Sequence, residues 1–425
     1  MRKSKKLNKK IINYKNSKIF IFAFVVSLFQ ITAYKYIWSL EVFSRLINLI
    51  LLSIFVWYLA SFYYKSKLGK RLMYLYVLPG FLIALGLFIN VSYSAFSNTK
   101  ILNQYASIIS WVIYLSIPIF VIYKKINVSL LWQYFNLFMT GVVSLSIVEY
   151  FLIFFGYVQT RLILTSGGPF LAGFFSMLYG IEAGNSEIEI HYRFYASFME
   201  PGTLAMFLLP VIAYTFIHSK YFNLAIYLIA MYLTDSLGGL IGLFCLIPLL
   251  FYLKYRRSTL KNLLLFFIIS LSILLNYEYF KDRYEKKGAS ASVRENSALN
   301  FVANFPLLVL RYPFGLPRTE LTSDSEKNRL YSGSNFALGT AYMKGGFIAF
   351  IGYSFVILIS LAYSARSFFH KGLDNDEKVV VASLFCMIPF IFQRATIWDS
   401  SIFAFLYCPY LIVFLKNTRG NPPAG

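Results

Sequence analysis

A long succession of apolar stretches divides the chain, and this feature limits its fold more than any other. Four of them lie near the N-terminus, at residues 19–37, 46–64, 72–90 and 108–123. Each reaches or approaches the roughly 20 apolar residues that an α-helix needs to cross the hydrocarbon core of a bilayer. Because 58% of the residues are hydrophobic and only 14% are charged, a soluble globular fold is excluded. We therefore predict an integral membrane protein.

Similar segments recur along the whole chain and predict an all-α polytopic protein with about twelve transmembrane helices. The first segment is longer than the core of a signal peptide and lacks a small-residue cleavage pattern, so we expect it to remain as the first span. The predicted helices cover residues 18–38, 46–64, 72–90, 105–123, 129–155, 202–217, 221–234, 237–253, 260–276, 337–363, 379–393 and 400–415.

Basic residues in alternate loops predict the orientation. The N-terminal tail MRKSKKLNKK belongs in the cytoplasm by the positive-inside rule, and both termini are then cytoplasmic. These loop cations explain most of the net charge of +22, and their placement is unlike that of a nucleic-acid-binding face, so we expect no nucleic acid partner. The basic loops expected on the cytoplasmic side are residues 65–71, 123–127, 218–220, 254–261 and 366–378.

The chain is thereby divided into five parts. Residues 1–17 form a basic cytoplasmic tail, residues 18–275 carry the first nine helices, and residues 276–335 form a large extracytoplasmic loop. Residues 336–415 carry the last three helices, and 416–425 form a second cytoplasmic tail. A further outer loop at about 156–201 holds an apolar, glycine-containing piece, residues 165–180, that we expect to be re-entrant or interfacial.

Arginines gather in the two long outer loops, where topology does not require them. A guanidinium is always charged and binds a phosphate or carboxylate through two parallel hydrogen bonds. A set of arginines on one face therefore indicates an anionic substrate. The alternative for each single arginine is a weak surface pair with a neighbouring acidic residue such as Glu285, Glu295 or Glu320. The arginines are Arg161, Arg193, Arg283, Arg294, Arg311, Arg318 and Arg329.

A second candidate lies where the first long outer loop enters the next helix. Arg193 is followed by Glu200, Pro201 and Gly202, which puts a carboxylate at the membrane boundary beside a helix N-terminus. Two roles are open for Glu200: a helix cap, or a general base oriented with Arg193. His191 is a rival base.

Three ionisable residues lie within or at the edge of predicted spans, where charge is costly and often marks a site. Glu149 is a candidate substrate-binding residue. Lys344 lies about two turns into its helix, where it can snorkel outward or hold a phosphate. Asp235 is expected at an outer mouth, where it caps the helix that begins there. The three cysteines and three histidines show no metal-ligand spacing, so we expect neither metal nor cofactor.

Several short motifs, taken in order, resemble the bacterial O-antigen polymerase and ligase family. The likeness covers about residues 190–355, roughly the second half of the chain. The motifs are Arg193 with FxEPG at 198–202, TDSLGG at 234–239, SVREN at 292–296, RYPFGL at 311–316, and SNFALGTAYMKGGFIAFIG at 334–352.

The resemblance implies a fold like that of lipid-dependent glycosyltransferases, in the bacterial cytoplasmic (inner) membrane. It also implies a glycosyltransferase that joins undecaprenyl-pyrophosphate-linked repeat units into O-antigen, capsule or exopolysaccharide, without metal. Its partners would be the lipid-linked donor and acceptor, membrane lipid, a chain-length regulator and a flippase. The alternatives are an O-antigen ligase or a flippase. The ligase branch typically has a histidine where this chain has Ser334, which favours the polymerase.

The same resemblance assigns residue roles. Arg193, Arg294 and Arg311 are expected to contact the pyrophosphate, and Glu200 with Arg193 and Arg294 forms the catalytic set. The expected substrate-binding residues are Arg283, Arg311, Arg318, Arg329, Asn335, Lys344, His191 and Glu149.

Overall fold

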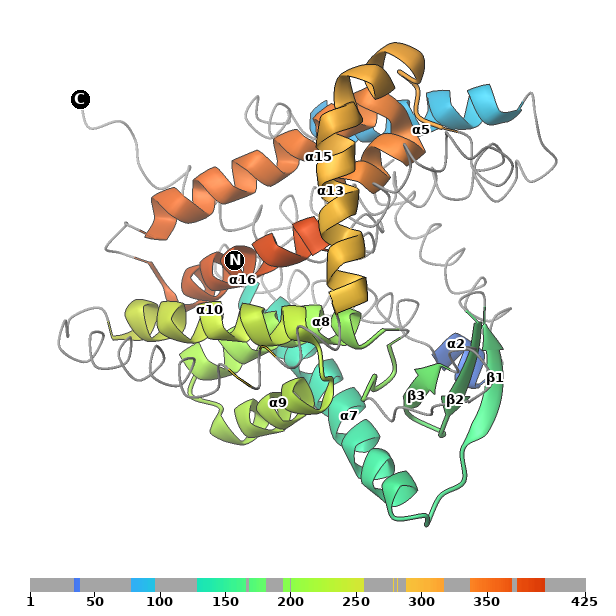
Figure 1. The fold of residues 1–425 in the computed structure, drawn as a ribbon. Coiled ribbons are helices and arrows are strands. Elements are labelled where there is room, and N and C mark those ends of the chain that lie inside the picture. Colours follow the sequence, from blue (N-terminus) through green and yellow to red (C-terminus); the bar gives the residue numbers. More distant parts are fainter. Residues whose placement is uncertain are drawn as a thin grey trace, which may run out of the picture. The chain divides into compact units, whose positions relative to one another are not determined.

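A computed structural model of the chain describes residues 34–38, 78–95, 128–165, 168–180, 194–198, 200–255, 278, 281, 288–316, 337–368 and 373–393. The described residues are mostly helical, as the sequence predicts (Figure 1). Among the described residues, three stretches of helix are long and apolar enough to cross a membrane: Ser129–Phe154, Leu237–Lys254 and Ala337–Ala365. They coincide with three predicted spans, and they give the chain the character of a helical membrane protein.

Shorter apolar helices coincide with three further predicted spans, at Leu78–Ser92, Pro201–Ile217 and Tyr221–Leu233. The predicted span at 379–393 lies within the helix Asn375–Gln393. The predicted spans at 46–64, 105–123, 260–276 and 400–415, residues 18–33 of the first predicted span and both termini lie outside the described residues. The total of about twelve spans and the cytoplasmic placement of the termini therefore stay predictions.

The described elements belong to two compact units. Helix α16 (Asn375–Gln393) is shared, because residues up to Ser383 belong to unit 1 and residues from Leu384 onward belong to unit 2. Unit 2 also contains α5 (Leu78–Ala95), α13 (Gly288–Arg311) and α15 (Ala337–Phe368). Unit 1 contains α2 (Tyr34–Ile37), α7 (Val128–Phe154), β1 (Arg161–Thr165), β2 (Gly168–Ala172), β3 (Met177–Gly180), α8 (Pro201–Ile217), α9 (Tyr221–Leu233) and α10 (Leu237–Lys254).

Helix α8 is the core of unit 1. Every residue from Pro201 to Thr215 is buried, as is Ile217, because α7, α9 and α10 pack around the helix. Its sequence is apolar on all sides, which is the pattern of a helix enclosed by protein. Pro201 occupies the first turn, where its missing N–H costs no hydrogen bond.

Polar side chains join α7 to α9 within this apolar bundle. The Tyr227 hydroxyl lies 2.7 Å from Thr140 Oγ1 and donates to the Asn136 carbonyl oxygen over 2.9 Å. Asn223 Nδ2 also donates to Thr140 Oγ1, over 3.1 Å. Hydrogen bonds of this kind stabilise helix pairs where water is absent.

The first long outer loop contains a small sheet, so the all-α prediction is wrong in this region. Strands β1, β2 and β3 form a three-stranded antiparallel sheet in that order, and Thr165 pairs with Gly168 between β1 and β2. The expected re-entrant or interfacial piece at 165–180 is therefore largely strand. It is too short to span as a helix, and strand pairing satisfies its backbone groups instead.

In unit 2, α5 and α15 pack closely and antiparallel through small residues. A Cβ added to Gly86 would lie 2.4 Å from the Gly345 carbonyl oxygen, and one added to Gly352 would lie 2.8 Å from the Pro79 carbonyl oxygen. Small residues let two apolar helices approach until their backbones touch, which is the usual mode of helix association in membranes.

The predicted large outer loop contains a helix that the sequence analysis missed. Helix α13 runs from Gly288 to Arg311, and its second half is apolar. Ala298, Phe301, Phe305 and Leu308 recur at helical spacing and pack in a cluster with Tyr342 and Phe350 of α15. The polar composition of the loop as a whole concealed this amphipathic half.

Candidate functional site

Glu149 lies in the last turns of α7, is only 5% exposed and is clasped by the loop between β2 and β3. One carboxylate oxygen accepts a hydrogen bond from the Phe174 N–H. The other accepts from the N–H groups of Phe175 and Ser176, over 2.8 and 2.7 Å, and from the Ser176 hydroxyl over 2.6 Å. The sequence left this charge without an explanation, and these four donors stabilise it.

Gly173 is required for this clasp, which we define as Glu149 with residues 173–176. A Cβ at Gly173 would lie 2.4 Å from the Glu149 carboxyl carbon. Only glycine therefore lets the loop backbone close around the carboxylate. No sequence motif predicts such a loop, because the carboxylate and its hydrogen-bond donors lie on different elements.

The first long outer loop, at about 156–201, also contains the FYASF segment, residues 194–198, and all five of its residues are buried. The Met177 N–H donates to the Ala196 carbonyl oxygen over 2.6 Å, and the Phe194 N–H donates to the Leu233 carbonyl oxygen over 3.3 Å. The ring of Phe198 stacks on Phe207 of α8, 5.3 Å between centroids. In sequence, the segment directly follows Arg193 and ends two residues before Glu200.

Glu200 is the N-cap residue of α8, and its carbonyl oxygen accepts from the N–H groups of Thr203 and Leu204, both over 3.1 Å. Its side chain makes no capping hydrogen bond with the described first turn of the helix. The Glu200 carboxylate therefore does not fill the capping role that the sequence left open to it. The side chain is half-buried at the positive end of the helix.

The structure corrects the role expected of Asp235. The N-cap of α10 is Ser236, whose side chain accepts from the Gly239 N–H over 3.3 Å. Asp235 lies one residue earlier, with a positive φ of 51°. Serine and aspartate are both favoured caps, so sequence alone did not separate the two neighbours.

The predicted span at 337–363 is broken at Gly346, which has φ 65° and ψ −164°. The YPFGL turn, residues 312–316, fills the break. The Leu316 N–H donates to the Met343 carbonyl oxygen over 3.1 Å, and the Phe347 N–H donates to the Pro313 carbonyl oxygen over 2.9 Å. A broken helix needs such partners for its freed backbone groups where no water reaches them.

Side chains secure the same turn. The Tyr342 hydroxyl donates to the Tyr312 carbonyl oxygen over 2.9 Å, and Asn90 Nδ2 of α5 donates to the Phe314 carbonyl oxygen over 2.7 Å. A Cβ added to Gly346 would lie 2.5 Å from the Pro313 carbonyl oxygen. The RYPFGL and AYMKGGF motifs, separate in sequence, are thus one packed structure.

Two candidate cations border this structure. Arg311 directly precedes the YPFGL turn, and Lys344 directly follows Met343; both side chains are exposed. We call the broken stretch of α15 with the YPFGL turn, Arg311 and Lys344 the helix-break site.

The other predicted site residues are less completely described. Arg294 lies on α13, and only its backbone position is described. Arg161 is exposed and donates to the Ile37 carbonyl oxygen, so this outer arginine has a structural contact. The residues His191, Arg193, Arg283, Arg318, Arg329 and Asn335 lie outside the described part of the chain.

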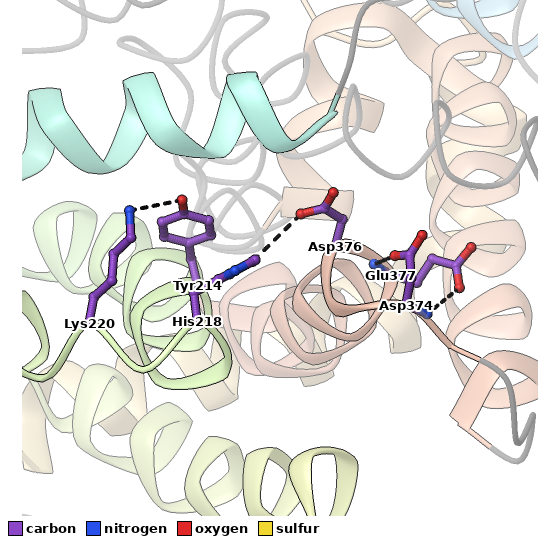
Figure 2. A network of polar contacts seen from close by, with 6 residues as sticks. All are labelled: Tyr214, His218, Lys220, Asp374, Asp376 and Glu377. Carbon is purple, nitrogen blue, oxygen red and sulfur yellow. Dashed lines mark hydrogen bonds and ion pairs between the residues drawn. The ribbon is translucent and has the colours of Figure 1, made fainter.

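A polar network that the sequence analysis did not single out lies in two loops predicted on the cytoplasmic side (Figure 2). His218 Nε2 lies 3.6 Å from Asp376 Oδ1, and Lys220 Nζ donates to the Tyr214 hydroxyl over 3.1 Å. Asp374 and Glu377 form a reciprocal capping box at the start of α16, with both hydrogen bonds at 2.9 Å. The Asp-x-x-Glu spacing was the available sequence signal for this cap.

Comparison with protein-family models and with curated proteins finds no match for this chain. Among the residues that the structure describes, no group of three or more histidine, cysteine or acidic side chains is placed to hold a metal ion. The family resemblance accordingly stays a prediction drawn from the motifs, and the fold defines the class of helical membrane proteins.

Proposed function

We propose that the chain is a glycosyltransferase of the bacterial cytoplasmic membrane that joins polyprenyl-diphosphate-linked oligosaccharide repeat units into a surface polysaccharide on the outer face. The helix-break site is the observation that supports this function best. It unites two of the resembling motifs, and it displays Arg311 and Lys344 beside a rigid backbone framework.

The chemistry of this site suits a diphosphate. The Arg311 guanidinium carries a planar fork of donors and Lys344 carries a compact charge, and both residues are exposed. Cations fixed in advance stabilise the charge that develops as a diphosphate leaves, and they do so without reorganising during the reaction. Arg294, which lies on α13 of the same unit, is proposed to add to this cationic set, and Arg193 keeps the phosphate-binding role that the sequence suggests.

In the proposed reaction, a hydroxyl oxygen of the acceptor repeat unit attacks the anomeric carbon of the donor glycan. The bond between that carbon and the diphosphate oxygen breaks, and the polyprenyl diphosphate leaves with its electron pair. Glu200, the base that the sequence suggests, is proposed to accept the hydroxyl proton. The roles of His191, Arg283, Arg318, Arg329 and Asn335 in binding the glycan carrier are part of the same proposal.

The test is to replace Arg311 in cells whose surface polysaccharide depends on this chain. We expect Arg311→Ala to shorten the polymer to single repeat units or nearly so, and Arg311→Lys to recover only part of the length because it loses the fork. Leu310→Ala is the matched control, since Leu310 is the neighbouring residue on α13 and is 83% exposed. Normal polymer length in Arg311→Ala, at equal protein level, would refute this function for the helix-break site.

A flippase or a ligase would behave differently in the same cells. Loss of a flippase leaves the repeat units on the inner face, whereas loss of a polymerase leaves single units on the outer face. Loss of a ligase leaves long polymer that stays on its lipid carrier. Analysis of the accumulated lipid-linked glycan therefore separates the three functions.

A further inference from the structure

The Glu149 clasp joins α7 to the loop between β2 and β3 in unit 1. The Glu149 carboxylate accepts hydrogen bonds from three backbone N–H groups and one hydroxyl. An ionised carboxylate has two oxygens that only accept, which suits a loop that presents only donors. A glutamine has the same size but one oxygen and one NH₂ group, and the NH₂ group cannot accept from a backbone N–H.

The clasp is connected to the FYASF segment by a short path. Met177 directly follows Ser176 of the clasp and donates its N–H to Ala196 of the segment, over 2.6 Å. Two ring contacts add to this path: Tyr150 beside Glu149 packs edge-on against Phe194, and Phe170 of β2 packs edge-on against Tyr195. The segment is thus held on one side by α7 and on the other by the sheet.

The segment in turn sets the entry to α8. Phe198 is two residues before Glu200, and its ring is fixed against Phe207 one and a half turns into the helix. Ala196 adopts a positive φ of 45°, which a free loop of L-residues rarely adopts. The segment holds this conformation because its two ends and its centre are bound to neighbouring elements.

We infer that Glu149 is a positioning residue: through the loop at 173–176 it fixes the FYASF segment and so the placement of Glu200 at the start of α8. This role replaces the substrate-binding role that the sequence suggested for Glu149. Its catalytic consequence rests on the proposed function, whereas its structural consequence does not.

Hydrogen exchange on the full-length protein in lipid nanodiscs tests the structural consequence directly. In Glu149→Gln, the amides of residues 174–177 and 194–198 should exchange about tenfold to a hundredfold faster, because only one acceptor oxygen remains and at least one buried N–H group of the loop loses its partner. Thr140→Val is the matched control on α7, since it removes the contacts with Tyr227 and Asn223 and leaves the clasp intact. Unchanged exchange in Glu149→Gln would overturn the inference.

The kinetics of chain growth test the positioning role. We expect Glu149→Gln to lower kcat about tenfold or more while KM for the lipid-linked donor changes less than about twofold, because the misplaced group is a base and not a binding residue. Glu149→Asp keeps two acceptor oxygens and should recover part of kcat. Faster exchange with normal kcat would refute the positioning role, whereas an inactive wild-type protein would count against the proposed function and leave the exchange result standing.

Discussion

The Glu149 clasp and the helix-break site show two different uses of charge at predicted membrane boundaries. Glu149 is buried, and the loop backbone supplies its partners. Arg311 and Lys344 are exposed, and the backbone around them is satisfied by other groups. Glu149 and Lys344 both lie within predicted spans, yet one is buried and the other is exposed. The informative distinction is whether the charged group is buried among backbone donors, as Glu149 is, or exposed, as Arg311 and Lys344 are.

The largest effect should come from the glycine that breaks α15. Gly346→Ala places a side chain on a residue with φ 65° and brings Cβ within 2.5 Å of the Pro313 carbonyl oxygen, so we expect a loss of about 3 kcal/mol or more. Thermal unfolding in detergent measures the loss. Gly141→Ala on α7 is the control, because nothing lies within 4 Å of its added Cβ, and it should not destabilise the protein.

A somewhat smaller loss of stability is expected when Gly173 of the clasp is replaced. Gly173→Ala would push the Glu149 carboxylate away from its donors, and leaving buried N–H groups unpaired costs about 1–3 kcal/mol. The same unfolding assay measures the effect. If Gly173→Ala were as stable as the wild type, the close approach of the loop to Glu149 would be wrong.

Removing a single hydrogen bond from the helix-break site or from the Glu149 clasp should lower the stability by a smaller and similar amount. Asn90→Leu removes the bond to the Phe314 carbonyl oxygen, and Ser176→Ala removes one of the four donors to Glu149. Each should cost about 1 kcal/mol. Thermal unfolding in detergent measures both losses, and a variant as stable as the wild type would contradict the hydrogen bond that it removes.

The smallest change in stability is expected at the exposed cations. Arg311→Ala and Lys344→Ala should each alter the free energy of unfolding by less than about 0.5 kcal/mol, because both side chains are exposed. A large destabilisation by either variant would place these cations among the structural charges, like Glu149, and would remove the contrast between the two regions.

Hydropathy alone predicted the spans at 129–155, 237–253 and 337–363, since a bilayer demands a long apolar stretch whatever the tertiary contacts are. It did not predict the break at Gly346. The two glycines at 345 and 346 were visible, but a glycine pair in an apolar helix is also compatible with close packing, as Gly345 shows against Gly86. The break depends on the YPFGL turn, which is distant in sequence.

The sequence predicted which residue types belong to the candidate site, but it did not predict the contacts that hold these residues in place. Arg311 was predicted as a site residue because topology does not require arginines in the outer loops, and Lys344 because charge within a span is costly. Their common framework required the structure. Glu149 was correctly recognised as unusual, but its partners are backbone N–H groups, which carry no sequence signal. Helix α13 was missed because the apolar residues of its second half are diluted by a polar first half.

Elongation by the purified protein tests the central claim most directly. Full-length protein in liposomes would be incubated with polyprenyl-diphosphate-linked repeat units, and glycan length would be measured over time. We expect the wild type and Leu310→Ala to produce longer glycans, and the Arg311→Ala/Lys344→Ala double variant to produce essentially none while unfolding at the wild-type temperature. Elongation by the double variant at the wild-type rate would contradict the assignment of the diphosphate to the helix-break site.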